Sequence, residues 1–379
     1  MADRGRQHPE PALHATPRIE PPPSESQPPD VVGSAFVPAL ELSRDFHREV
    51  VAPILAPESP PAALLGWGSD VLGYDTPTST DHGWGPRLLV FAPDDARASS
   101  WQERIDCQLP DTFRGWPVRF GWDEVEPRSH VEVTTLARWC TAYLGVDATR
   151  TLDTFDWLVM PQQLLLGVTA GVVHADPDGQ LGELRVSLGW FPDQVWRWLI
   201  GCQWHRIGQE EAFVARTAGL GDETGSAITA ARLARDLMRL ALLFDRRYAP
   251  YQKWLGTAFA RMPHHDDLPA HLAAVVRAAD APRRESVLAA AYVDLAVRFN
   301  ALGLCPRIEP TVSDYYQRPA QVIFADRFAD ATFDTVTDPE LRQLPPIGSV
   351  DQLADSTDLL SSGSRSRLLL EYYRTAVRD

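Results

Sequence analysis

The sequence predicts an α+β protein in which a region of short strands comes first and an α-helical region follows. Four short runs of apolar and β-branched residues are typical of buried strands: 64–69, 87–91, 117–120 and 130–133. Beyond residue 144, apolar residues recur instead every three or four positions, which is the period of an amphipathic helix. The change of period along the chain therefore predicts two structurally different regions.

The length and composition fit two domains preceded by a tail. The chain has 379 residues, and 44% of them are hydrophobic, enough to supply a core for each domain. We predict a Pro-rich tail over 1–35, a sheet-containing domain over 36–150 and a helical domain over 151–379. The tail is predicted to be disordered, because prolines among polar residues bury too little apolar surface to offset the entropy of ordering.

The net charge and the cysteine content limit the kinds of ligand that the protein is expected to bind. A formal net charge of −15 argues against a broad nucleic-acid surface, which needs clustered Lys and Arg, but allows a small phosphorylated ligand. The four cysteines lie far apart, without the short spacing of a zinc site or a disulfide framework. No apolar run resembles a signal peptide or reaches the roughly 20 residues that cross a bilayer. We therefore expect a cytoplasmic protein without membrane contact.

The predicted elements of the first domain begin with a helix. Apolar residues at helical spacing from Phe36 to Leu55 predict an opening helix that ends near Pro53. The run 64–69 predicts a strand that leads into a turn. In the strand 130–133, side chains alternate across the sheet, so Glu132 faces away from its valine neighbours. A carboxylate there can face a cleft while the valines pack in the core.

Five helices are predicted in the second domain, several of them beginning at proline, which suits the first helical turn: 192–216, 226–247, 250–260, 269–279 and 283–302. We expect this domain to be all-helical. A polar connector over 333–350 is predicted to precede one or two closing helices.

One motif combines residues suited to binding phosphate. Gly68-Ser69 follows the first predicted strand. Glycine lets the backbone approach an anion, the Ser hydroxyl donates a hydrogen bond, and a helix start after it would offer free N–H groups. Twelve residues later, Asp81 lies at the entrance of the next predicted strand, where a carboxylate can hold Mg²⁺ against phosphates.

These residues carry a family resemblance. Gly68-Ser69, Gly73 and Ser79-Thr80-Asp81 resemble the signature of the polymerase-β-like nucleotidyltransferase superfamily. Within it, the sequence is similar to a bacterial family, domain of unknown function 4037, over several segments: 68–87, 114–117, 202–204, 209–211 and 253–259. The resemblance spans about residues 40–325. It implies a small mixed-sheet nucleotidyltransferase domain followed by a helical bundle that closes the cleft.

The resemblance also implies a reaction and its participants. A nucleoside monophosphate would pass from a nucleoside triphosphate, with ATP as the expected substrate, to an unidentified acceptor in the presence of Mg²⁺. Asp81 would bind metal, and Glu132 would be a metal ligand or general base. The residues expected to contact the nucleotide are Gly68, Ser69, Asp70, Arg87 and Lys253.

The sequence departs from the family at one position. Where the family pattern is expected to read Asp-His-Asp-Trp-Gly, this chain reads Asp81-His82-Gly83-Trp84-Gly85. On a strand, residues 81 and 83 would share one face, so a metal-binding pair loses one member. Asp70, Asp75 and Glu132 are the carboxylates left to compensate. The alternative function is accordingly a catalytically impaired nucleotide-binding or interaction protein, with a protein partner.

Structural roles compete with several of these assignments. The alternative for Gly68-Ser69 is an ordinary turn, and the alternative for Asp81 is a helix or turn cap. Arg87 suits a pairing with an acidic residue as well as with phosphate. Lys253 suits a solvated helix surface. The loop 264–267, His-His-Asp-Asp, is interpreted as structural, because adjacent loop residues seldom converge on one ion.

Overall fold

The computed structural model describes residues 36–122, 125–264 and 266–376, so the tail predicted over 1–35 lies outside the described residues. Its main sheet has five strands in the order β5-β6-β2-β1-β7. Their bounds are Arg119–Trp122 (β5), Val125–Thr134 (β6), Arg87–Phe91 (β2), Ala62–Leu64 (β1) and Val172–Ala175 (β7). Only β2 and β6 pair in parallel, so the described sheet is mixed. The protein is thus α+β, as the sequence predicts.

The opening helix is confirmed, with a change of pitch inside it. It comprises α1 (Ala39–Phe46), a π-helical turn η1 (His47–Val51) and α2 (Ala52–Leu55). The helix continues past the predicted end at Pro53. That proline falls in the first turn of α2, where its missing N–H is tolerated.

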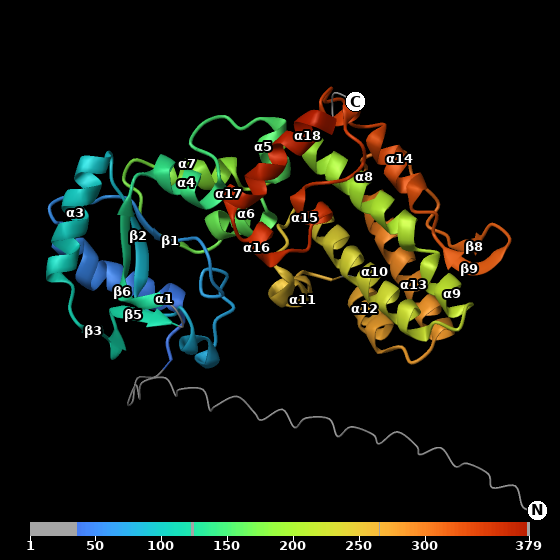
Figure 1. Ribbon diagram of the computed structural model, residues 1–379, viewed down its shortest axis with the longest axis horizontal. Helices are drawn as coiled ribbons and strands as arrows, with labels where there is room; N and C mark the ends of the chain where they lie inside the picture. The colour runs from blue at the N-terminus through green and yellow to red at the C-terminus, as the bar shows by residue number, and fades with distance from the viewer. Residues whose placement is uncertain (1–35, 123–124, 265, 377–379) are drawn as a thin grey trace, which may run out of the picture.

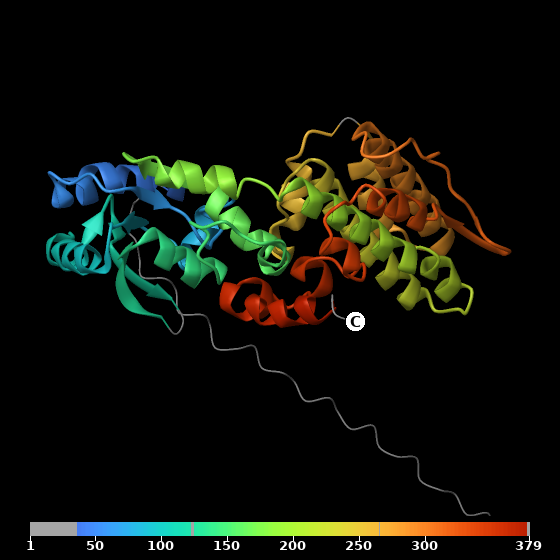
Figure 2. The ribbon, with the colours of Figure 1, turned by 90° about the horizontal axis from the view of Figure 1, so that it is seen from above.

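The two faces of the sheet join different cores. On one face, Leu88 and Val90 of β2 pack with α1, η1, α2 and α3 (Asp95–Gln108). On the other face, Leu89 and Phe91 join a much larger core that continues through the helical region. Figures 1 and 2 show the sheet at one end of the molecule and the long helices at the other. One core therefore ties the sheet to the helices.

The helical region begins beside the sheet. Its first helices are α4 (Leu136–Leu144), α5 (Thr154–Val159), α6 (Gln162–Thr169) and α7 (Gln180–Ser187). The longer helices follow: α8 (Asp193–Glu210), α9 (Phe213–Ala218), α10 (Glu223–Phe244), α11 (Gln252–Ala260), α12 (Leu268–Arg277), α13 (Ala281–Ala301) and α14 (Asp326–Phe333). Short elements close the chain: η3 (Leu341–Gln343), α15 (Val350–Leu353), α16 (Thr357–Leu360), α17 (Gly363–Ser366), η4 (Arg367–Leu369) and α18 (Leu370–Ala376).

The expectation of an all-helical second domain is wrong. Strand β7 extends the main sheet from beyond residue 150, because its Val172-Val173 run follows a turn at Gly171 (φ 68°) and pairs with β1. A second exception is the hairpin of β8 (Ser313–Tyr315) and β9 (Arg318–Val322), which projects from the far end in Figure 1. A further small hairpin, β3 (Thr112–Phe113) with β4 (Trp116–Pro117), lies in the sheet region.

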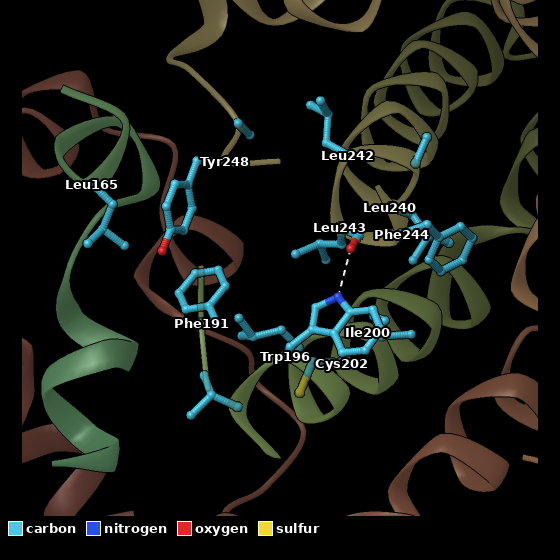
Figure 3. Packing of buried hydrophobic residues seen from close by; sticks show 14 of the residues in the cluster. Leu165, Phe191, Trp196, Ile200, Cys202, Leu240, Leu242, Leu243, Phe244 and Tyr248 are labelled. Carbon is cyan, nitrogen blue, oxygen red and sulfur yellow. Dashed lines mark hydrogen bonds between the residues drawn. The ribbon is translucent and has the colours of Figure 1, made fainter. Parts of the chain in front are cut away.

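Aromatic residues of α8 fill the helical core. Trp196 is 3% exposed, and its Nε1–H donates to the carbonyl of Leu243 on α10 at 2.7 Å (Figure 3). Phe191 and Tyr248 meet edge to face beside it, with ring centroids 5.2 Å apart. These rings bury large apolar areas while the indole N–H remains bonded. Among the described residues, no helix combines the length and apolar character of a bilayer-crossing segment.

Candidate functional site

The Gly68-Ser69 motif lies in a turn that is not followed by an α-helix. The Tyr74 N–H donates to the carbonyl of Ser69 at 2.8 Å, and the Gly73 N–H donates to that of Asp70 at 3.2 Å. The next helical element is η2 (Pro77–Asp81), a single 3₁₀ segment. The α-helix start expected after Ser69 is therefore wrong, and Gly68-Ser69 leads into a hydrogen-bonded turn instead.

Asp75 connects the segment after the turn to two other segments. Its Oδ2 accepts the backbone N–H of Ala39 at 2.8 Å and the indole N–H of Trp84 at 3.0 Å. These bonds anchor residue 75 to α1 and to the segment before β2. Asp75 thus has a structural role.

Asp70 and Arg87 bind each other. Arg87 Nε donates to Asp70 Oδ2 and Nη2 donates to Oδ1, both at 2.8 Å, and the side chains of Arg87 and Asp70 are 8% and 4% exposed. Arg87 Nη2 also donates to the carbonyl of Trp67 at 2.5 Å, and the guanidinium carbon lies 4.3 Å from the Trp67 ring centroid. The structure therefore favours the pairing of Arg87 with an acidic residue. Of its guanidinium nitrogens, Nη1 makes none of these bonds.

Gly68 is needed where this ion pair passes the backbone. Its φ is 111°, in the region that favours glycine. A Cβ at this position would lie 2.9 Å from Arg87 Nη2 and would collide with the Asp70 carboxylate. The close approach of a charged pair thus explains the glycine physically, and phosphate binding by Gly68 and Ser69 stays a prediction.

Asp81 and Gly83 do not lie on a strand. Asp81 is the last residue of η2 and is exposed, and β2 begins only at Arg87. Gly83 has a φ of 63°, and a Cβ there would lie 3.1 Å from the Trp67 ring. The expected shared strand face is therefore wrong, because the left-handed backbone at Gly83 interrupts the extended chain. Position 83 is buried beside tryptophan.

Glu132 has the predicted orientation. It is exposed on β6 opposite Leu89 of β2, while Val131 is 2% exposed and packs on the opposite face. Glu132 borders a cavity of about 420 Å³ between the sheet and α4. The polar and aromatic residues of its lining include Trp67, Arg87, Arg128, His130, Glu132 and Tyr143. Asp81 is not among the lining residues.

His130 contributes a neutral ring to the cavity wall. Burial lowers its pKa below the ordinary value, outweighing the hydrogen bond to the Phe120 carbonyl that raises it. The imidazole is therefore neutral at pH 7, and Nε2–H donates to that carbonyl at 2.9 Å. This bond gives His130 a structural role in the cavity wall.

Lys253 lies on a helix that docks against the turn. Its ammonium is 5.1 Å from the ring centroid of Trp254, and the side chain is exposed. Trp254 packs against Tyr74, with ring centroids 5.1 Å apart. Arg261, directly after α11, donates to the Gly73 carbonyl at 3.1 Å. The tertiary fold thus brings α11 to the turn that carries Gly68-Ser69.

The carboxylates do not fit a two-magnesium site. Such a site needs several converging oxygen ligands, and Gly83 supplies none from a side chain. Asp81 lies outside the cavity lining that includes Glu132. Within the described ranges, no group of three or more His, Cys, Asp or Glu side chains is placed to hold a metal ion.

Sequence reasoning missed several residues of the cavity wall. Trp67, Arg128 and Tyr143 come from three separate segments and have no shared spacing. Trp67 is 46% exposed beside Gly68, whereas the sequence predicts a buried strand over 64–69, so its position in the wall also had no signal in the sequence. Arg128 and Tyr143 could be placed only by the fold.

A family model agrees with the resemblance over part of the helical region. Residues 157–255 match the model of the family described as Domain of unknown function (DUF4037). A solved nucleotidyltransferase-like protein from Exiguobacterium sibiricum 255-15 is similar at 11% identity over 80% of this chain and 91% of that chain, with a TM-score of 0.32. No curated protein matches the chain. The matched residues lie in the helical region and include α8, α10 and the start of α11.

Proposed function

We propose that this protein binds a nucleotide through a nucleotidyltransferase-like site whose capacity to transfer a nucleoside monophosphate is impaired. The observation that carries the proposal is Gly83. The family pattern has its second carboxylate there, whereas this chain has a left-handed glycine packed against Trp67. A metal site loses both a ligand and balancing negative charge when one carboxylate is missing.

The cavity beside β2 and β6 supports a nucleotide as the ligand. Its volume of about 420 Å³ falls within the usual range of small-molecule sites. Arg87 and Arg128 provide positive charge for phosphates, and Trp67 and Tyr143 provide aromatic surface for a base. Arg87 is held by Asp70 and Trp67, so Nη1 is the guanidinium nitrogen left for a ligand.

Glu132 supports a second candidate function, residual nucleotidyl transfer. Among the described residues that line this cavity, Glu132 is the one carboxylate, and Arg87 lines the same cavity. A carboxylate so placed can accept a proton from an acceptor hydroxyl. Residual transfer would need Mg²⁺, a nucleoside triphosphate such as ATP and an acceptor. The first candidate function needs only the nucleotide.

Nucleotide binding is tested by isothermal titration calorimetry with ATP, GTP, CTP and UTP, each with Mg²⁺ or with EDTA. We expect binding of at least one nucleotide with an affinity that changes less than threefold when Mg²⁺ is removed. Arg128→Ala should weaken binding about tenfold, the size of a charge-assisted hydrogen bond. Arg138→Ala, exposed on α4 and outside the cavity, is the matched control. Absence of binding, or equal effects of both variants, would reject the site.

Transfer is tested separately with α-labelled triphosphates, Mg²⁺ and a small-molecule extract. We expect no labelled product and no pyrophosphate release. Labelled product that disappears in both Asp81→Asn and Glu132→Gln would instead establish the second candidate. Binding without Mg²⁺ dependence together with no turnover supports impaired catalysis.

A further inference from the structure

A second, smaller cavity lies within the helical region. Its volume is about 120 Å³, and none of its lining residues borders the larger cavity. Arg235 and Arg239 contribute to its wall from successive turns of α10, Gln163 from α6 and Gln252 from the first turn of α11. Residues four apart on a helix share a face, so both guanidinium groups reach the same space.

The two arginines share one exposed carboxylate. Asp355 Oδ1 lies 3.0 Å from Arg235 Nη1 and 3.7 Å from Arg239 Nη2, and its side chain is 56% exposed. The arginine side chains are only 17% and 15% exposed. The two largely buried arginines therefore share one partner that water also solvates, and Arg235 has a second, buried ion-pair partner in Asp236.

Arg235 has donors left over. Its Nε and Nη2 are shielded from solvent and have no hydrogen-bond partner in the described part of the chain. The nearest acceptor is Asp236 Oδ1, which forms an ion pair with Nη2 at 3.6 Å but no hydrogen bond and is itself shielded from solvent, while Asp236 Oδ2 accepts Arg206 Nε at 2.9 Å. A buried donor without a partner is costly, which makes an additional acceptor favourable.

The other carboxylate that lines this cavity, Asp351, is bonded to α6. Asp351 Oδ2 accepts the backbone N–H of Gln162 at 3.0 Å, and Arg239 Nη1 donates to the Asp351 main-chain carbonyl, also at 3.0 Å. The Asp351 carboxylate is thus bonded to α6, and it adds negative charge near Arg239 that a ligand must overcome.

The size and the helix end suit one oxyanion. A volume of about 120 Å³ holds about four waters at about 30 Å³ each, or one phosphate group. Tyr251 and Gln252 at the start of the nine-residue helix α11 line the cavity, and the Tyr251 side chain makes no capping bond to the helix.

We propose that this cavity binds a single phosphate group, free or as part of a larger ligand, through Arg235 and Arg239. The competing interpretation is that both arginines serve only to hold the 351–355 segment against α10. That interpretation predicts no dependence of stability on phosphate. The proposal does not require the nucleotide site to exist.

The probe is inorganic phosphate, compared with sodium chloride at equal ionic strength, in thermal unfolding and isothermal titration calorimetry of the full chain. We expect phosphate to raise the melting temperature and to bind at one site. Arg235→Gln and Arg239→Gln should each weaken binding at least tenfold. Arg232→Gln, on the same helix and paired with Glu210 at 2.7 Å, should bind as the unsubstituted protein does.

Two further variants keep the test decisive. Gln163→Glu retains both arginines and their partners but puts a carboxylate in the wall, so phosphate binding should be lost even if the arginine variants misfold. Arg128→Ala alters only the larger cavity and should leave phosphate binding unchanged. No stabilisation of the unsubstituted protein by phosphate, or equal stabilisation of the Gln163→Glu variant, would overturn the proposal.

Discussion

Arg87 and Asp70 form a buried, two-pronged ion pair across 17 residues of sequence, with both hydrogen bonds at 2.8 Å. The pair links the start of β2 to the glycine turn and holds the shape of one side of the larger cavity. The carboxylate of Asp70 accepts from Nε and Nη2 of Arg87, so Nη1 is the guanidinium nitrogen outside the pair. The cavity wall is therefore preorganised by a bond within the protein.

Removing one partner of this pair should destabilise the protein strongly. Asp70→Ala leaves a buried guanidinium without its carboxylate, a loss of about 3–5 kcal/mol in the free energy of unfolding. The double variant Asp70→Ala, Arg87→Met should cost less than the sum of the two single changes. Urea denaturation of all four proteins measures this coupling. Additive effects would mean that the pair contributes no interaction energy.

Gly83 should resist replacement even by the residue of the family pattern. Its left-handed backbone costs a non-glycine residue about 1–2 kcal/mol, and a Cβ would press on the Trp67 ring at 3.1 Å. We expect Gly83→Ala and Gly83→Asp both to lower the melting temperature. In a Trp67→Ala background the contact is relieved, so the penalty should shrink to the backbone contribution. An unchanged penalty there would assign the cost to the backbone alone.

The contact between α11 and the turn should control the mobility of the turn. The Arg261 guanidinium carbon lies 4.3 Å from the Tyr74 ring centroid, a stacking worth about 0.5–1 kcal/mol at an exposed site. Arg261→Ala should speed hydrogen exchange at the Tyr74 amide, which is bonded to Ser69. Arg246→Ala, which removes a similar stacking on Trp196, is the control. Equal exchange in both variants would contradict this coupling.

Stability should fall as pH rises toward neutrality because of Glu211. Burial raises the pKa of Glu211 from an ordinary value of 4.5 to about 7, although bonds from the Ala325 and Ile323 N–H groups lower it. The folded state thus binds the proton more tightly than the unfolded state. The resulting stabilisation is present below pH 4.5 and is lost as pH rises through about 7, a change on the order of 3 kcal/mol.

The matched variants are Glu211→Gln and Glu210→Gln, examined by chemical denaturation between pH 4.5 and pH 8. The first should flatten the decline of stability with pH, because the titrating carboxyl is gone. The second should retain it, since Glu210 is a neighbouring carboxylate paired with Arg232. A decline of the same size in both variants would assign the pH dependence to other groups.

Local patterns in the sequence determined much of the secondary structure. The strand predicted over 87–91 coincides with β2, and the helices predicted over 226–247 and 283–302 correspond to α10 and α13. These elements have clear apolar periods because each buries one face or stripe in a core. The Gly68-Ser69 turn and the glycine at position 83 were also evident from the sequence. Local spacing is sufficient for such features.

Tertiary contacts decided which of these residues form a site. Arg87 pairs with Asp70, Glu132 borders a cavity that excludes Asp81, and Arg261 reaches Gly73 across 188 residues of sequence. Likewise β7 joins the sheet from within the region predicted to be helical. The spacing of apolar side chains along a helix or strand specifies which face of that element is buried. It does not specify which other element covers that face. That choice depends on long-range packing, which local spacing does not encode.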